Sequence, residues 1–260
     1  MRHALVLPTL VMRAAIRGSK RFHHSDRRPA QAFIELALVL PILIIILLGL
    51  VEVAMFIGRY LDVLDLTREA ARFASVRDPF DIIHPRDTDC STPNLFDFYY
   101  DTSCIFSPPV GSANCTDPAF CNGLNPYMVI DSEWDDVVIS IYTISSNSVS
   151  DVWPQPDGYW ALSDHDPDTA HNGNWRYSCQ DHTTPISTQP YYNQDRVQAS
   201  LSSSAPPTKG FVAIEFYYCY NQALNVPLLS AFVPNPLRIH AYTIMPLPAG
   251  QPTPTTTVYP

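Results

Sequence analysis

The sequence predicts an α+β fold, in which a long N-terminal transmembrane helix precedes an antiparallel β-sheet domain with long, disulfide-bearing loops. Three observations carry this prediction. A nearly continuous apolar run lies near the N-terminus, which is typical of a helix that spans a membrane. Later segments are rich in β-branched and aromatic residues, which are typical of strands. Six cysteines all follow the apolar run, and an even number of them in an exported domain favours disulfides.

The apolar run is long enough to cross a bilayer. Residues 36–51 are uncharged, and the run from Ala32 to Gly58 contains 27 residues, among them Glu35 and Glu52. As a helix it is about 40 Å long, against a hydrocarbon core of about 30 Å. We therefore expect Glu52 near the outer headgroups and Glu35 near the inner face. The alternative, a buried helix of a soluble protein, is disfavoured by so continuous a run.

Charge is distributed unevenly along the chain. Residues 1–30 hold seven basic residues and one acidic residue, so that 9 of the 16 basic and 24 of the 25 acidic residues follow. A basic segment before an apolar helix predicts a cytoplasmic N-terminus, a single crossing of the cell membrane and an extracytoplasmic C-terminal domain. The acidic remainder argues against nucleic-acid binding, which requires positive charge.

The first part of the chain resembles a known family. The segment "RRPAQAFIELALVLPILIIILLGLVEVAMFIGRYLDVLDLTREAARFASVRDP" is similar to the N-terminus of TadE-like proteins, the pseudopilins of the tight-adherence pilus assembly system. The shared pattern is a basic leader, a small residue, Gln-Ala, an acid five residues past a cleavage point and an apolar helix containing "LVLP". A downstream segment similar to T-x-x-A-R-x-A, here "LTREAARFAS" with a second Ala before the Arg, completes it.

The resemblance implies a processed, non-enzymatic structural subunit without a cofactor. Its partners would be the lipid bilayer, a prepilin peptidase, other pilins or pseudopilins and the Tad assembly machinery of an adhesive type IV pilus. Cleavage is expected between Ala30 and Gln31, which leaves Glu35 at the fifth mature position. The family usually has Gly before the cut, where this chain has Ala30.

Two residues are unusual for a membrane helix. A lone carboxylate at Glu35 costs about 2.5–3.5 kcal/mol on insertion scales. Cleavage would create an ammonium group at Gln31, four residues earlier on the same helical face, and that group or one from a neighbouring subunit would neutralise the acid. The alternative is that Glu35 extends to the inner headgroups. Pro41 removes one backbone hydrogen bond, so we expect a kink or local loosening there.

We divide the chain into four parts. Residues 1–30 form the basic leader, 31–78 the membrane helix and its outer continuation, 79–247 the β-rich domain, and 248–260 a Pro/Thr-rich tail. The outer half of the helix is expected to pack a stripe of mainly small residues on a sheet. That stripe comprises Tyr60, Leu64, Ala71 and Ala74.

Three segments of the β-rich part are predicted to be strands. They are 137–144, which alternates partially, 211–220, in which Val212, Ile214 and Phe216 share one face, and 237–245, in which apolar residues alternate with polar ones. Residues 79–128 and 145–209 are rich in turn-forming residues and are interpreted as loops. The connection 221–236 is apolar, so it must be buried, lie against the membrane surface or meet a partner.

The cysteines allow 15 pairings. Their order along the chain suggests Cys90–Cys104, Cys115–Cys121 and Cys179–Cys219. Zinc binding is the rival interpretation, but the spacing lacks a repeated C-x-x-C.

Enzymatic and metal sites are disfavoured. The acidic series Asp164, Asp166 and Asp168 fails the EF-hand pattern, because Thr169 and Trp175 stand where that loop needs Gly and Glu. No hydrolase elbow, H-E-x-x-H motif or P-loop occurs in the sequence. Loose metal binding by the loop 163–182, or a hydrolase built around it, ranks below a solvated acidic loop; its histidines are His165, His171 and His182.

A second function competes with the pilus-assembly subunit. The outer domain of an anchored protein would serve as a binding module for a surface ligand such as a glycan. Aromatic residues suited to such a role, although each of them would equally suit a core, are Trp134, Trp153, Trp160 and Trp175.

Overall fold

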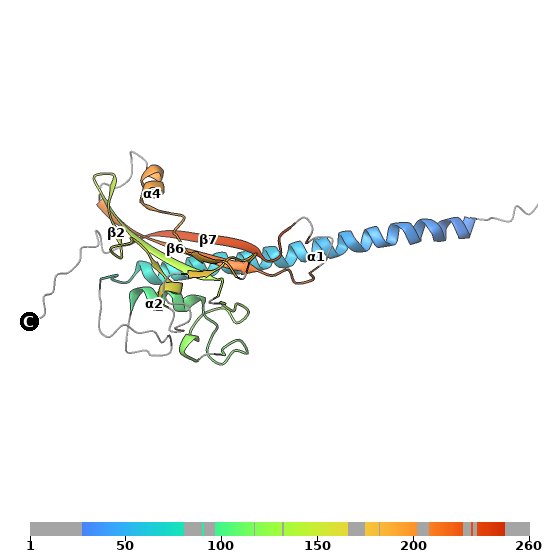
Figure 1. Cartoon of the computed structure of the whole chain (residues 1–260), viewed down its shortest axis with the longest axis horizontal. Helices are drawn as coiled ribbons and strands as arrows, with labels where there is room; N and C mark the ends of the chain where they lie inside the picture. The colour runs from blue at the N-terminus through green and yellow to red at the C-terminus, as the bar shows by residue number, and fades with distance from the viewer. Residues whose placement is uncertain are drawn as a thin grey trace, which may run out of the picture. The chain divides into compact units, whose positions relative to one another are not determined.

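The computed structural model describes residues 28–80, 90, 97–116, 118–131, 133–165, 175–181, 183–201, 208–225, 230 and 233–247. The predicted leader up to residue 27 and the tail from residue 248 lie outside the described residues. The chain forms two compact units, residues 1–46 and 47–260. Helix α1 (Arg28–Ser75) contributes to both units (Figure 1).

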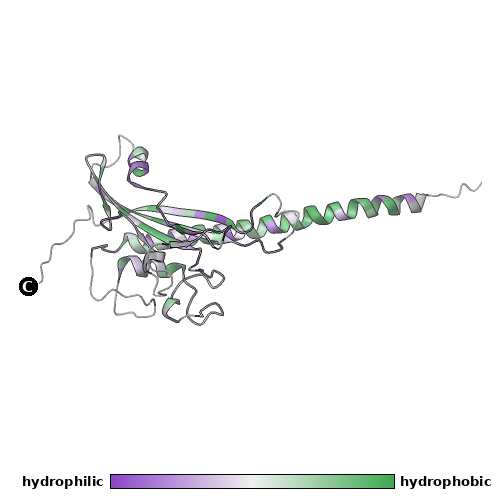
Figure 2. Cartoon of the chain, viewed as in Figure 1, coloured by the Kyte–Doolittle hydropathy of each residue, from purple (hydrophilic) through white to green (hydrophobic). Residues whose placement is uncertain are grey.

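The first part of α1 is apolar and uncovered. From Gln31 to Ile46 every side chain is exposed, including large apolar ones such as Phe33 at 76% and Leu38 at 68%. In Figure 2 most of the ribbon of this stretch is green, the colour of hydrophobic residues. Among the described residues, α1 is the helix that is long and apolar enough to cross a membrane. Large apolar side chains left in the open are stable in lipid and not in water, which supports the predicted membrane anchor.

The second unit is built on one antiparallel sheet. Its strand order is β2-β1-β6-β7, with β3 also paired to β1. Strands β1 and β2 form a hairpin whose two turn residues, Ser146 and Asn147, both have positive φ, as a tight two-residue turn between twisted strands requires. The strands are β1 (Asp136–Ser145), β2 (Ser148–Trp153), β3 (Trp160–Ala161), β6 (Thr208–Tyr220) and β7 (Leu237–Leu247).

One face of the sheet packs against the outer half of α1. Side chains such as Ile139 of β1 and Ile214 of β6 meet a helix stripe that includes Val63 and Ala70, all of them fully buried. Small residues on the helix allow its backbone to approach the sheet closely. The stripe comprises Val63, Leu66, Thr67, Ala70, Ala71 and Ala74.

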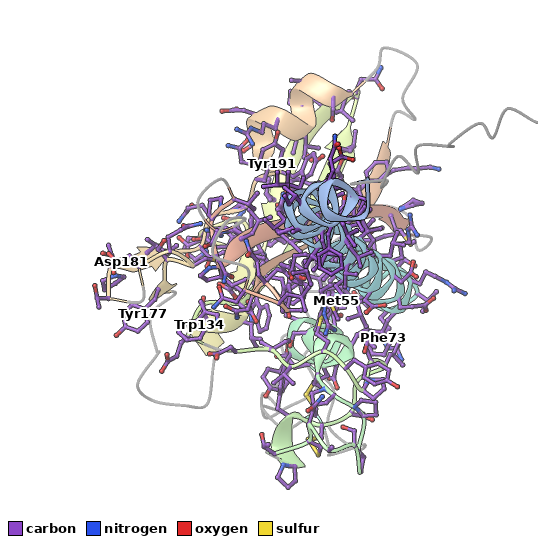
Figure 3. All side chains as sticks on the ribbon, turned by 90° about the vertical axis from the view of Figure 1, so that its right-hand side faces the viewer. Met55, Phe73, Trp134, Tyr177, Asp181 and Tyr191 are labelled. Carbon is purple, nitrogen blue, oxygen red and sulfur yellow. A yellow bond between two sulfur atoms is a disulfide. The ribbon has the colours of Figure 1, made fainter. Side chains whose placement is uncertain are left out.

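The opposite face of the sheet is covered by the segment 185–201. This segment contains β5 (Pro185–Ser187), which pairs with β4 (Trp175–Tyr177), and α4 (Gln194–Ser200). Val197 of α4 packs with Tyr142 and Ala213 of the sheet. Tyr191 lies on this segment and is labelled in Figure 3, which looks along α1 and also labels Met55 and Phe73 on the helix.

Several short elements lie outside the sheet. Helix α2 (Phe98–Ser103) begins at Asp97, whose carboxylate accepts from the backbone N–H groups of Tyr99 and Tyr100. It is followed directly by the 3₁₀ turn η1 (Cys104–Phe106). A second 3₁₀ turn, η2 (Pro118–Phe120), and the short helix α3 (Leu162–His165) complete the secondary structure.

The predicted α+β architecture is confirmed, with some differences in detail. The three predicted strands correspond to β1, β6 and β7, and the long helix to α1. Helix α2 lies in a segment predicted to be loop, and β2 and α4 lie in the other. Of the predicted helix stripe, Ala71 and Ala74 are fully buried, whereas Tyr60 remains 37% exposed.

Candidate functional site

The two residues at the start of the membrane helix lie side by side. The Gln31 side-chain amide donates a 3.1 Å hydrogen bond to the Glu35 carboxylate, one helical turn further on, and both side chains are exposed. The four-residue spacing therefore does bring position 31 within reach of the acid. The chain is helical on both sides of this pair, and α1 continues without interruption through Pro41. Ala30 is also in α1.

Glu52 joins α1 to the chain that leaves β6 through three hydrogen bonds. Its side chain is 6% exposed. It accepts hydrogen bonds from the Tyr220 hydroxyl at 2.9 Å and from the backbone N–H groups of Ala223 and Leu224, both at 2.8 Å. Both carboxylate oxygens are thus occupied, and the chain that leaves β6 is attached to the helix at this point.

The surroundings of Glu52 are aromatic. Phe56, one helical turn further, packs edge-on against Tyr220 with ring centroids 5.4 Å apart. Burial and the hydrogen bond to negatively charged Glu52 raise the pKa of Tyr220 to about 12. Arg59, a further turn along, donates a 2.9 Å hydrogen bond to the backbone carbonyl of Tyr127. Three successive turns of α1 therefore each hold a part of the outer domain.

A second carboxylate is buried in the centre of the sheet. Glu215 of β6 is fully buried and accepts 3.0 Å hydrogen bonds from the backbone N–H groups of Tyr191 and Tyr192. The Tyr217 hydroxyl, also 3.0 Å away, and the His240 ring nitrogen, at 2.7 Å, complete its partners. Because these groups satisfy both oxygens, Glu215 fastens the covering segment to the sheet.

Two adjacent aspartates act in the same way at the start of β1. Asp135 accepts a 2.7 Å hydrogen bond from the backbone N–H of Cys219. The carboxylate of Asp136 is fully buried and accepts hydrogen bonds from the backbone N–H and the hydroxyl of Ser163, the hydroxyl at 2.7 Å. It also accepts a hydrogen bond from the Thr188 hydroxyl. The donors to these two carboxylates come from β6, from α3 and from the residue after β5, so the two aspartates join separate elements and their arrangement is structural.

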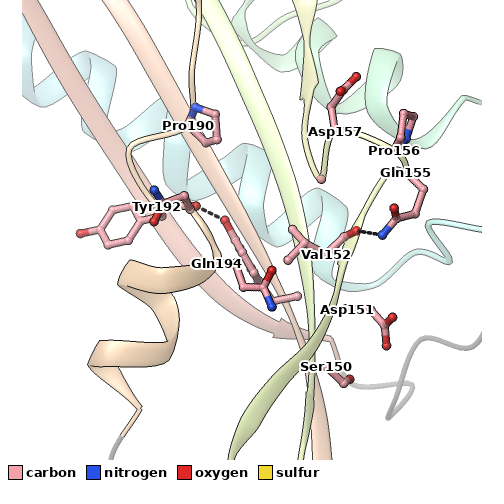
Figure 4. A pocket seen from close by; sticks show the side chains of 12 residues that line it. Ser150, Asp151, Val152, Gln155, Pro156, Asp157, Pro190, Tyr192 and Gln194 are labelled. Carbon is pink, nitrogen blue, oxygen red and sulfur yellow. Dashed lines mark hydrogen bonds between the residues drawn. The ribbon is translucent and has the colours of Figure 1, made fainter.

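A polar hollow of about 360 Å³ opens between β2 and the start of α4 (Figure 4). The hydroxyl of Tyr142 at its floor donates a hydrogen bond to the backbone carbonyl of Tyr192, and burial raises the pKa of Tyr142. The rim is mainly polar. It includes Ser150, Asp151, Gln155, Asp157, Asn193 and Gln194.

The six cysteines form three disulfides. The pairs are Cys90–Cys104, Cys115–Cys121 and Cys179–Cys219, the same pairs that follow from their order along the chain. The described residues contain no group of three or more His, Cys, Asp or Glu side chains placed to hold a metal ion. Of the acidic loop 163–182, residues 166–174 and 182 lie outside the described residues, including Asp166, Asp168, His171 and His182, as do the side chains of Asp164 and His165.

The tryptophans do not form an exposed platform in the part of the chain that the structure describes. Trp160 is 5% exposed and belongs to the core, and Trp153 packs against the same core and against Phe80. Trp134 is half-buried, and the side chain of Trp175 is not described. Core packing therefore accounts for Trp153 and Trp160.

Sequence inspection missed Glu52 and Glu215 as organising residues. Apart from Tyr217, two residues from Glu215, their partners lie 23 to 172 residues away, so spacing along the chain does not show them. For Glu52 one signal existed, because a carboxylate inside an apolar run requires a partner. Because Glu52 was expected to lie near the hydrated headgroups, no protein partner was sought for its carboxylate.

The comparisons with known proteins agree with this geometry over the helix. Residues 30–72 match the TadE-like protein family. The resemblance predicted from the sequence is confirmed for this segment. The TadE-like match begins at Ala30, next to the Gln31–Glu35 pair, and ends within the helix stripe that packs on the sheet. The searches of curated proteins and of solved structures gave no match.

Proposed function

We propose that this chain is a non-enzymatic structural subunit, a pseudopilin that serves assembly of an adhesive Tad (type IV) pilus or a related secretion apparatus. The observation that carries the proposal is the TadE-like match over residues 30–72, which covers the uncovered apolar helix and its packed continuation. A protein of this kind acts through helix packing and surface contacts, so it requires no catalytic centre.

The proposed orientation places the N-terminus in the cytoplasm and the sheet domain outside. Two independent features support it. The basic residues before the helix favour the cytoplasmic side. The three disulfides all lie beyond the helix, and disulfides persist in oxidising compartments.

A prepilin peptidase would cut between Ala30 and Gln31. Cleavage would place the ammonium group on the backbone nitrogen of Gln31, one helical turn before Glu35, and the side-chain amide of the same residue already reaches the acid at 3.1 Å. When helices of neighbouring subunits pack together, the same acid would accept the ammonium group of a neighbour and fix the axial register. Pro41 would permit local loosening of α1 during that packing.

Two measurements test the proposal. Mass spectrometry of the N-terminus from membrane fractions should find a mature chain that begins at Gln31. Deletion of the gene should abolish pili, and the wild-type chain supplied in trans should restore them. An intact leader would exclude processing, and normal pili after deletion would exclude the assembly role.

The polar hollow beside β2 favours a second candidate, an anchored module that binds a glycan. Its rim offers carboxylate, amide and hydroxyl groups to sugar hydroxyls. The exposed carboxylate of Asp157 is the group to change. Loss of binding to immobilised cell-surface glycans in Asp157→Asn, with wild-type pili, would select this function over the first.

A further inference from the structure

The connection between β6 and β7 carries no charged residue. It runs from Asn221 to Pro236 and contains no Asp, Glu, Lys, Arg or His, although the chain beyond residue 30 is strongly acidic. At the described ends of the connection two apolar side chains are exposed, Leu224 at 39% and Val233 at 41%. Burial within the domain therefore does not account for these two residues.

The two ends of the connection are held together rigidly. The backbone N–H of Gln222 donates to the Asn235 side chain at 2.9 Å, and the Gln222 amide donates to the backbone carbonyl of Val233 at 3.3 Å. The Asn235 amide in turn donates to the Asn225 side chain at 2.9 Å. Leu224 and Val233 are thus presented from one ordered platform rather than from free loop ends.

Glu52 fixes the level of this platform along α1. The backbone N–H of Leu224 is 2.8 Å from the Glu52 carboxylate, and Figure 1 shows the connection beside the helix. Glu52 follows directly on the apolar segment Ala32–Val51, 20 residues that rise about 30 Å, which is the thickness of the hydrocarbon core. The platform therefore stands where the hydrocarbon ends.

We propose that the ends of the β6–β7 connection, represented by Leu224 and Val233, rest in the outer headgroup region of the bilayer. The lipid contact continues from the uncovered surface of α1 at the same level, where Val51, Val53 and Met55 are 41%, 54% and 48% exposed. Asn and Gln side chains are suited to the hydrated headgroups and the apolar side chains to the acyl boundary. The inference depends on the membrane anchor and is independent of the role in pilus assembly.

This contact would orient the outer domain on the membrane. A single helix by itself leaves an attached domain free to tilt. A second point of contact at Glu52, beside the helix, restricts that tilt and presents the far end of the sheet in a defined direction. The occupant we infer is lipid, because a protein partner of an acidic domain has no charged group here to recognise.

Photocrosslinking tests the proposal directly. The full chain would be placed in phosphatidylcholine nanodiscs with the photoreactive amino acid p-benzoylphenylalanine at position 224 or 233. The control position is Val76, which is 70% exposed just past the end of α1 and far from Glu52 along the helix. We expect about tenfold more lipid adduct at 224 and 233 than at 76, since an interfacial segment enters the bilayer by about 5–10 Å.

A second measurement protects the test against a variant that fails to fold. Leu224→Trp and Val76→Trp would be compared in nanodiscs that contain brominated phosphatidylcholine, and hydrogen-exchange protection of β6 would show that each variant has folded. Stronger quenching of the tryptophan at 224 supports the contact. Equal quenching, equal lipid adducts or adducts to protein at 224 and 233 would overturn it.

Discussion

The hydroxyl of Tyr220 donates a 2.9 Å hydrogen bond to the carboxylate of Glu52 across 168 residues of sequence. The same carboxylate binds the backbone N–H groups of Ala223 and Leu224. One acid inside the apolar run therefore fixes where the sheet domain meets α1. The first prediction concerns this acid.

Replacing Glu52 with Ala should destabilise the protein by about 1.5–3 kcal/mol, because three donors lose a charged acceptor. Thermal unfolding of the full chain in detergent, with hydrogen exchange at the amides of residues 223 and 224, measures the effect. Glu69→Ala is the matched control on the same helix, since the side chain of Glu69 is 46% exposed and pairs only with Arg72 at the surface. Equal stability of the two variants would contradict the role assigned to Glu52.

The raised pKa of Tyr220 predicts a loss of stability at alkaline pH. An ordinary tyrosine has a pKa of about 10. Burial and Glu52 raise the pKa of Tyr220 to about 12 in the folded protein. The neutral Tyr220 hydroxyl therefore contributes fully to stability below the pKa that tyrosine has in the unfolded chain. This contribution is lost as the pH rises through the higher pKa of Tyr220 in the folded protein. Tyr220→Phe should flatten this part of the stability profile.

Chemical unfolding between pH 9 and 12 measures that slope. Wild type should lose stability more steeply than Tyr220→Phe across this range. Other buried tyrosines with raised pKa values, among them Tyr142 and Tyr218, retain part of the slope in both proteins. If the two profiles run parallel, Tyr220 does not titrate as the structure indicates.

The disulfides should contribute unequally to stability. The bond Cys179–Cys219 spans 40 residues and Cys115–Cys121 only 6. By loop-closure entropy, replacing both cysteines with Ala should cost about 4 kcal/mol for the first pair and about 2 kcal/mol for the second. Denaturant unfolding of the two double variants gives the comparison. A larger loss from the shorter loop would show that local packing, rather than chain entropy, determines their contribution.

Removing the Glu215 carboxylate should loosen the segment 185–201, which covers the sheet, more than the sheet itself. In Glu215→Ala the N–H of Tyr192 loses its acceptor, the N–H of Tyr191 keeps only the Tyr217 hydroxyl, and His240 loses its carboxylate partner. We expect a loss of about 3 kcal/mol, since removing one member of a buried charged network is strongly destabilising. Hydrogen exchange should accelerate at residues 191 and 192 more than along β1. Uniform acceleration across the sheet would instead assign Glu215 to the core as a whole.

Glu35→Gln tests the assembly role. The variant should still insert into the membrane, because the change removes a charge from the membrane helix. Its incorporation into the pilus assembly should fall by about tenfold if the lost ion pair contributes about 1.4 kcal/mol. Immunoblotting of sheared surface fractions against membrane fractions separates the two effects, with Glu69→Gln as control. Unchanged incorporation would favour a carboxylate that only extends to the headgroups.

The sequence predicted the elements that depend on local pattern. In β7 apolar and polar residues alternate because the strand has two different faces, and in β6 several apolar residues share one face, so Ile239 and Ile214 were assignable to the core from the sequence. Helix α2 was missed because six residues carry too little periodicity; its signal was the capping residue Asp97. The hairpin strand β2 was missed because its sequence, SVSDVW, is largely polar and only Val149 in it is buried.

The candidate site was predictable only in its first part. Gln31 and Glu35 are one helical turn apart, so their proximity follows from spacing alone. The positions of Glu52 and Glu215 depend on chain segments that meet only when the sheet has formed. A sequence pattern records which residues are apolar, but it does not record which distant N–H group a carboxylate will bind.

The packing of α1 on β6 and β7 determines the order in which the nascent protein can mature. The helix is translated first, and the strands β6 and β7, which cover Val63, Ala70 and Ala74, are translated last. Until β7 is complete, the apolar stripe of the helix therefore has no sheet to cover it. On the proposed topology, this interval falls after the anchor is complete and before the domain is.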